Sequence, residues 1–128
     1  AMNFVPAGVR YENGIFFIEI DSFKLQVPKK RAQVIKDLGK YKDKEVIFGL
    51  RPEHIELENT HPENAIEAIV DVTEPMGSEI YAYFSLGGKE ITARLTTEHV
   101  LTNGQSYSFF FNLDKMCLFD PQTEERIR

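Results

Sequence analysis

Apolar and polar residues alternate along most of this chain. Alternation with a period of two is typical of β-strands that bury one face, and short unbroken apolar runs are typical of strands buried on both faces. Both patterns occur here, separated by turn residues at intervals of about ten positions. The sequence therefore predicts eight short strands, at 15–20, 23–27, 45–50, 66–72, 80–86, 91–95, 107–113 and 116–119.

Turn residues mark the connections between these segments. Gly87-Gly88 predicts a two-residue hairpin, because both central positions of a type I′ turn need a positive φ. Gly49 lies inside an apolar segment, which indicates a bulge or a close approach of the backbone. Further turns are predicted at Asn13-Gly14, 75–78, Asn103-Gly104 and Asp120-Pro121.

One segment has helical rather than alternating spacing. Ala32, Ile35 and Leu38 share one face of a helix over 29–38, and Gly39 is a natural terminator. Eight short strands and one short helix predict a mainly β fold, a small barrel or sandwich. The length of 128 residues fits a single domain.

Composition and charge exclude several classes of protein. The single cysteine, Cys117, excludes an internal disulfide framework and multi-cysteine zinc sites. The net charge of −5 argues against a general nucleic-acid binder, and no apolar stretch is long enough to span a membrane. Residues 24–44 hold eight basic and two acidic side chains, a local charge of +6 that leaves −11 elsewhere. The basic segment and the acidic remainder are either two ordinary solvated surfaces, or they produce electrostatic fields of opposite sign that orient the domain against a partner.

Motifs for catalysis are absent from the sequence. It has no phosphate-binding loop, no G-x-G-x-x-G and no G-x-S-x-G, so these residues alone cannot hydrolyse ATP. His54, His61 and His99 lack a helical metal-ligand spacing, and we expect no metal site. Tyr81 and Tyr83 offer either a stacking surface for sugars or bases, or ordinary packing.

Four segments resemble a known family. Residues 48–55 (FGLRPEHI) resemble its G-[IL]-R-P-E-x-[IL] signature, and 73–79 (TEPMGSE) resemble its E-x-x-G stretch. Residues 118–124 (LFDPQTE) resemble its closing F-D-x-x-T segment, and 2–4 (MNF) resemble its opening. This family is the transport-associated OB (TOBE) domain, the C-terminal part of ATP-binding subunits in maltose-type sugar ABC importers. The chain departs from it at Glu125, where a glycine is usual.

The resemblance implies an OB-like fold and a non-catalytic role for residues 1–128. Such a domain would regulate and dimerise the ATP-binding subunit, with an ATPase domain that binds ATP and Mg²⁺ expected upstream of Ala1. Expected partners are a second copy, the membrane subunits through that ATPase domain, and a regulatory protein. We expect neither nucleic acid binding nor direct membrane insertion. The expected location is cytoplasmic, at the inner face of the cell membrane within the transporter complex.

Interface residues follow from this interpretation. We expect Arg51 to pair with Glu53 or Glu74, or else to contact the second copy. We expect no catalytic, metal-binding or cofactor-binding residue in the chain. The candidates for the interface are Arg51, Pro52, Glu53, Met76, Gly77 and Phe119.

Two other functions stay open. Small OB barrels can hold ligands on one face, so a sugar, a phosphorylated sugar or an anion could bind near Tyr81, Tyr83 and Arg94 as an effector. A nucleic-acid-binding OB domain is the third hypothesis, and only the basic segment 24–44 supports it.

Overall fold

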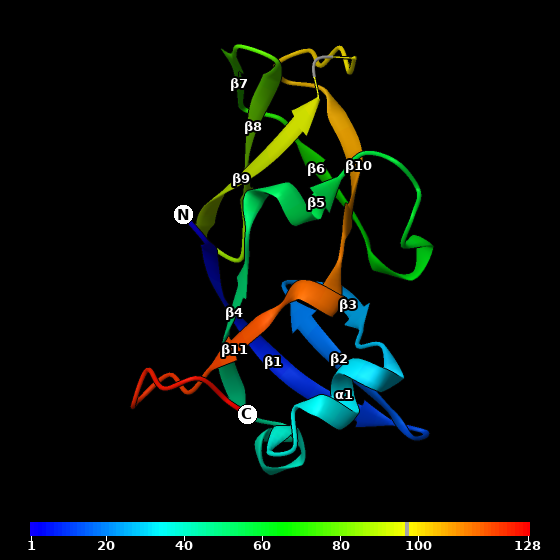
Figure 1. Cartoon of the computed structure of the whole chain (residues 1–128), viewed down its shortest axis with the longest axis vertical. Helices are drawn as coiled ribbons and strands as arrows, with labels where there is room; N and C mark the ends of the chain where they lie inside the picture. The colour runs from blue at the N-terminus through cyan, green and yellow to red at the C-terminus, as the bar shows by residue number, and fades with distance from the viewer. Residues whose placement is uncertain (97) are drawn as a thin grey trace.

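Five antiparallel strands form one sheet in the lower half of the molecule (Figure 1). The structure is a computed structural model that describes residues 1–96 and 98–128. The strands lie in the order β11-β4-β1-β2-β3, so the end of the chain returns to pair beside β4. Their bounds are β1 Asn3–Glu12, β2 Ile15–Ile20, β3 Phe23–Gln26, β4 Glu45–Leu50 and β11 Cys117–Phe119.

Two three-stranded antiparallel sheets form the upper half (Figure 1). One has the order β5-β10-β6 and the other the order β7-β8-β9. Their bounds are β5 Ile55–Glu56, β6 Ala65–Ile69, β7 Val72–Met76, β8 Glu79–Leu86, β9 Lys89–Thr96 and β10 Ser106–Phe111.

Short helices connect the strands. The described residues form one α-helix, α1 (Lys29–Val34), and four 3₁₀ helices. No helix in this described part is long and apolar enough to cross a membrane. The 3₁₀ helices are η1 Leu38–Tyr41, η2 Pro52–His54, η3 Pro62–Asn64 and η4 Leu113–Lys115.

The mainly β fold and all eight predicted strands are confirmed, but the sequence pattern misses β1, β5 and β7. In β1, Val5, Ala7 and Val9 are buried in alternation, as in any half-buried strand. Pro6 and Gly8 obscure this pattern, because both residues disfavour strands. Pro6 is tolerated because it lies in the half of β1 that pairs only with β4.

The turn predicted at 75–78 is shorter than expected. Pro75 and Met76 belong to β7, an edge strand, and only Gly77 and Ser78 form the turn. An edge strand accepts proline because one side of its backbone has no partner strand. Val72, which the alternation places on a buried face, is half exposed because the chain leaves β6 after Ile69 and starts a new strand.

The helix predicted over 29–38 ends early, at Val34. Ile35 and Leu38 are buried as predicted, but they lie beyond the α-helix. The Asp37 N–H donates to the carbonyl of Arg128 rather than to a carbonyl of the preceding turn. The C-terminal end of the chain therefore takes the place of the last helical turn.

Stacked phenylalanines join the three sheets in one core. Phe84 on β8 stacks against Phe109 on β10 with ring centroids 4.4 Å apart. Phe48 on β4 stacks against Phe111, also on β10, at 6.4 Å. Residues 109 and 111 share a face because strand side chains alternate, so β10 links the two halves of the molecule.

Two asparagine side chains tie the halves together through the backbone of edge strands. Asn64 accepts a hydrogen bond from the Gln26 N–H at 2.7 Å and donates one to the Gln26 carbonyl at 3.0 Å. Asn3 forms the same two bonds with Thr92, each at 2.9 Å. Since β3 and β9 are sheet edges, each asparagine pairs backbone groups that have no partner strand.

The glycine predictions are confirmed at two places. Gly87 and Gly88 have φ values of +59° and +74°, as the type I′ hairpin between β8 and β9 requires. At Gly49 a Cβ would lie 2.6 Å from the Met2 sulfur and 3.2 Å from the Phe119 ring. The missing side chain at Gly49 therefore lets these residues pack against β4.

The final turn lies beside Glu125, the position where the family usually has a glycine. The residue with positive φ is Glu124, at +62°. The Asp120 carboxylate accepts hydrogen bonds from the N–H groups of Gln122 and Thr123, and the Glu124 N–H donates to the Asp120 carbonyl. These bonds close the turn at Glu124, so the position that favours glycine is this residue.

Candidate functional site

The interface candidates separate into distinct places on the surface. Phe119 lines an apolar groove, whereas Pro52 and Glu53 line a neighbouring polar pocket. Met76 and Gly77 lie at the β7–β8 turn, at the upper end of the long axis in Figure 1 and remote from β11. The structure therefore does not bring all six candidates together.

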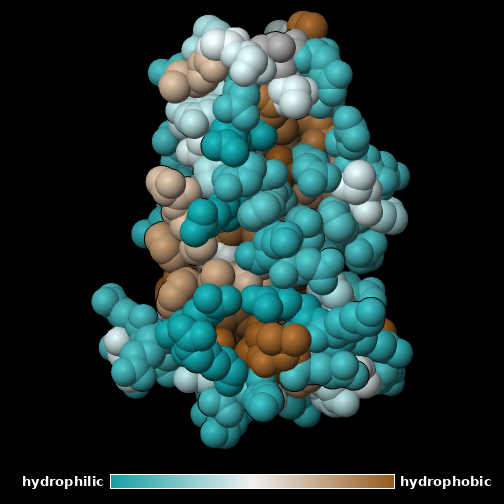
Figure 2. Space-filling view, viewed as in Figure 1, coloured by the Kyte–Doolittle hydropathy of each residue, from teal (hydrophilic) through white to brown (hydrophobic). Residues whose placement is uncertain are grey.

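The apolar groove has a volume of about 520 Å³ and aromatic walls. Phe4 is 50% exposed and meets Phe119 edge to face, with ring centroids 5.7 Å apart. Lys89, Asp120 and Glu124 add charges of both signs to its lining. Figure 2 shows moderately hydrophobic surface along the left edge of the molecule, where the N-terminus lies in Figure 1.

The polar pocket, of about 370 Å³, shares Phe4 with the groove. It brings together residues that the sequence assigned to two different hypotheses. Pro52 and Glu53 come from the interface set, and Tyr81, Tyr83 and Arg94 come from the effector set. Asn3, Glu90 and Thr92 complete its polar lining.

Charged groups of the pocket are partly paired. The Arg94 Nε lies 3.2 Å from a carboxylate oxygen of Glu79. The pKa of Glu53 is lowered, first by a hydrogen bond from its own backbone N–H and then by the positive charge of Arg94. The Tyr83 hydroxyl donates to Glu74 at 2.8 Å, and this bond raises the pKa of Tyr83. Glu53 is therefore ionised at neutral pH, and Tyr83 is a neutral phenol.

The ion pair expected for Arg51 is absent. Within the described ranges, Arg51 has no carboxylate oxygen within 4.0 Å, and its side chain is exposed. Glu74 instead accepts the hydrogen bond from Tyr83, and Glu53 faces the polar pocket. Pro52 explains the separation, since it begins η2 and Arg51 stays extended before it.

Asp120 anchors the turn that borders the apolar groove. Its second carboxylate oxygen accepts a hydrogen bond from the Tyr41 hydroxyl at 2.7 Å. Backbone N–H donation from Thr123, the Tyr41 bond and donation from Gln122 lower the pKa of Asp120. The same bond to Asp120 raises the pKa of Tyr41. The ionised carboxylate and the neutral phenol are thus the forms that the fold favours.

The Asp120 network makes a prediction about acid stability. Because the pKa of Asp120 is lower in the folded chain, its stabilisation is complete at neutral pH and is lost as the pH falls below about 4. We expect Asp120→Asn to lower the free energy of unfolding at pH 7, with the difference from the unsubstituted protein shrinking in acid. Urea titrations between pH 7 and pH 3 measure this. A difference that stays constant with pH, or an equal effect of the exposed control Asp114→Asn, would contradict it.

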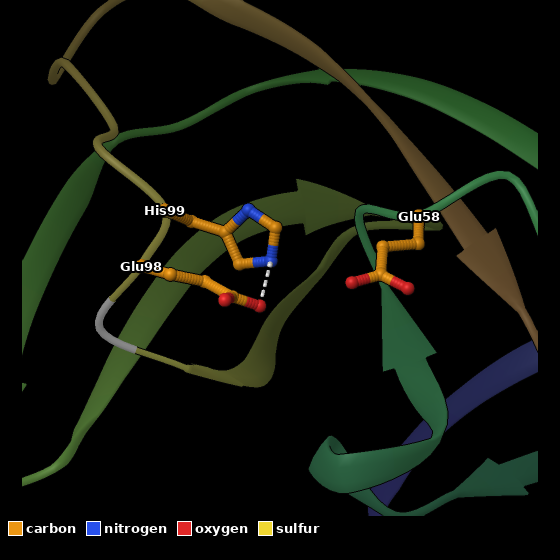
Figure 3. A group of neighbouring side chains, drawn as sticks. All are labelled: Glu58, Glu98 and His99. Carbon is orange, nitrogen blue, oxygen red and sulfur yellow. Dashed lines mark ion pairs between the residues drawn. The ribbon is translucent and has the colours of Figure 1, made fainter.

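Glu58, Glu98 and His99 form a group with metal-ligand atoms within 4.8 Å of one another (Figure 3). The group joins the segment after β5 to the segment after β9, and the His99 Nε2 lies 4.0 Å from a Glu98 oxygen. One imidazole and two carboxylates can hold a divalent cation. Both glutamates are exposed, and no further feature of the described residues points to a cation, so we assign no metal here.

Sequence reasoning misses several residues of these surfaces. Glu90 and Thr92 enter the pocket because β9 pairs with β8 in a register that sets them opposite Ser85 and Tyr83. The Gly87-Gly88 turn fixes that register, so the predicted hairpin already implies that Glu90 and Thr92 lie on the same face as Tyr83. Phe4 had a weaker signal, as an aromatic residue of the MNF segment.

Comparisons with known proteins agree with this architecture. The model of the MalK OB fold domain matches residues 1–55, and the model of the TOBE domain matches residues 48–119. The oligosaccharides import ATP-binding protein MsmX of Bacillus subtilis is 35% identical over the whole chain. The multiple sugar-binding transport ATP-binding protein MsmK of Streptococcus mutans is 32% identical over the same extent. The chain spans about a third of each relative, 35% and 34% of their lengths.

A solved structure shares the fold. The cytoplasmic molybdate-binding protein ModG superposes with a TM-score of 0.66 over 93% of this chain and 96% of its own, at 18% sequence identity. This likeness supports the OB-like fold predicted from the resemblance. The TOBE model alone covers more than half of the chain, and the MalK OB model covers most of the rest. The chain therefore belongs to the TOBE domain family, in the form found in ATP-binding subunits of sugar ABC importers.

Proposed function

We propose that residues 1–128 are the non-catalytic regulatory domain of the ATP-binding subunit of a carbohydrate ABC importer, and that the domain helps to dimerise this subunit. The observation that carries the proposal is the pair of family matches, which together run from residue 1 to residue 119. Its relatives are import ATP-binding proteins about three times as long as this chain. An upstream ATPase domain would then bind ATP and Mg²⁺ and contact the membrane subunits, at the cytoplasmic face of the membrane.

The apolar groove is the surface that we assign to the contact with a second copy. A two-fold dimer needs a surface that is complementary to itself. The groove is lined by the aromatic rings of Phe4 and Phe119 and by Lys89, whose charge is opposite to that of Asp120 and Glu124. Two such grooves related by a two-fold axis can pair Lys89 of each copy with an acidic group of the other. Of the six interface candidates only Phe119 lines this groove, so the other five stay predictions without a place in it.

Sedimentation velocity of the full-length subunit without nucleotide tests this role. Phe4→Ser removes the half-exposed ring, and we expect it to weaken dimerisation about tenfold or more, as for other aromatic anchors. Tyr11→Ser is the matched control, because Tyr11 is similarly exposed on the same strand but lies away from the groove. A subunit that stays monomeric, or a Phe4→Ser variant that dimerises like the control, would contradict dimerisation through this groove.

Effector binding is a second candidate function, and the polar pocket favours it. The pocket gathers Tyr81, Tyr83 and Arg94, the three residues expected near a bound sugar or anion. ModG, a molybdate-binding protein whose structure was solved with molybdate bound, supports the idea that this architecture can hold a small ligand. A ligand there would report metabolic state to the transporter. We also propose a regulatory protein as a partner of this domain.

A further inference from the structure

We propose that the polar pocket binds a neutral carbohydrate, of about the size of a mono- or disaccharide. The inference rests on the second candidate function, effector binding, and names the class of ligand. It is independent of the dimer contact, because the assigned groove and the pocket have different walls apart from Phe4.

The register of β8 and β9 builds the back wall of the pocket. Tyr81 lies opposite Arg94, and Tyr83 lies opposite Thr92. Because strand side chains alternate, these four project from the same face of the hairpin. The wall thus presents two phenol rings side by side, flanked by a guanidinium and a hydroxyl. Aromatic rings are suitable platforms for the apolar faces of a sugar ring.

The polar groups that stay available are both donors and acceptors. The Asn3 amide is used by both of its bonds to Thr92, and the Tyr83 hydroxyl donates to Glu74. Among the described residues, the Tyr81 hydroxyl has no hydrogen-bond partner, and Arg94 uses only its Nε on Glu79. The Glu53 carboxylate, on η2, also lines the pocket and is an acceptor. Sugar hydroxyls both donate and accept, so they match such a mixed set.

Charge argues against an oxyanion in the same place. The pocket contains one guanidinium, and Glu79 already lies 3.2 Å from it. Glu53 and Glu90 add two carboxylates to the lining. Even with the Ala1 amino group of this chain, which also lines the pocket, the three carboxylates outnumber the two cations, and this balance disfavours an anion. A neutral ligand avoids that repulsion and still gains the hydrogen bonds.

The size of the pocket fits this class of ligand. Its volume of about 370 Å³ lies at the lower end of the range of small-molecule sites, about 300 to 1,000 Å³. Ala1, Met2, Phe4 and Pro52 add apolar atoms to its lining. A sugar can therefore place one face on the aromatic wall and its hydroxyl edge toward Glu53 and Arg94.

Calorimetric titration of this chain with glucose, maltose and trehalose, and separately with sulfate and molybdate, tests the inference. We expect at least one sugar to bind and neither anion to bind. Tyr81→Ala and Arg94→Gln should each weaken sugar binding about tenfold or more. Tyr11→Ala, an equally small replacement of an exposed tyrosine outside the pocket, should leave it unchanged. Thermal melts of each variant check that it is folded.

The outcomes of this titration distinguish the carbohydrate ligand from the effector function on which it rests. Anion binding that Arg94→Gln abolishes would overturn a carbohydrate ligand but keep an effector site in this pocket. Sugar binding that both pocket variants leave intact would overturn the site. Failure of every ligand to bind would overturn the inference and the effector function together. The dimerisation proposal would stand in each case, because sedimentation of the full-length subunit tests it separately.

Discussion

Asn64→Asp should destabilise the folded chain by about 3–5 kcal/mol. Asn64 is 1% exposed, and its side chain is engaged at both ends by the backbone of Gln26. Aspartate keeps an acceptor for the Gln26 N–H but loses the donor to the Gln26 carbonyl, so two oxygens would face each other. It also buries a negative charge beside a backbone carbonyl, which is the costlier of the two effects. The free energy of unfolding from urea titration measures the loss.

Two further variants identify the cause of that loss. Asn64→Ala removes both hydrogen bonds without adding a charge, and we expect a smaller loss of about 2–3 kcal/mol. Asn103→Asp makes the same chemical change at an exposed turn, where about 0.5 kcal/mol or less is expected. Burial would raise the pKa of the new carboxyl at residue 64, so that variant should regain stability as the pH falls. Equal losses at residues 64 and 103 would show that the asparagine bonds contribute little.

The sequence does not reveal these asparagine bonds because the bonded residues are far apart along the chain. Asn64 stands 38 residues from Gln26, and Asn3 stands 89 from Thr92. An asparagine after a proline-containing segment looks like any turn residue, and its propensity carries no information about a remote edge strand. The strands that they cover, in contrast, follow from local alternation. The local pattern therefore predicts strands β3 and β9, but it does not predict which side chains form hydrogen bonds with the backbone groups at their free edges.

The candidate surfaces show the same division. Tyr81, Tyr83 and Arg94 can be selected from the sequence because alternation within two hairpin strands puts them on one face. Their meeting with Pro52 and Glu53 depends on the packing of η2 against β9, which no spacing predicts. The group of Glu58 with Glu98 and His99 is equally hidden, since Glu58 lies about 40 positions before the other two.

Gly87→Ala should also cost the fold a large amount, about 2–4 kcal/mol. The added Cβ would lie 2.2 Å from the Val5 Cγ2 and 3.2 Å from the Ile20 Cγ2. Both contact residues are buried and branched, so neither can move aside without disturbing the sheet below. The φ of +59° adds backbone strain, because a side chain disfavours the left-handed region. Chemical denaturation measures the loss.

The neighbouring glycine is a matched control for this contact. Gly88 also has a positive φ, +74°, but a Cβ there would meet no atom within 4 Å. Gly88→Ala should therefore show the backbone strain alone, about 1 kcal/mol. The difference between the two variants measures how closely the β8–β9 turn docks on β1 and β2. Adding Val5→Ala to Gly87→Ala should make the combined loss smaller than the sum of the single losses, because the smaller side chain removes the clash. Equal losses at Gly87 and Gly88 would contradict this docking, and strictly additive losses in the double variant would assign the cost to strain instead of contact.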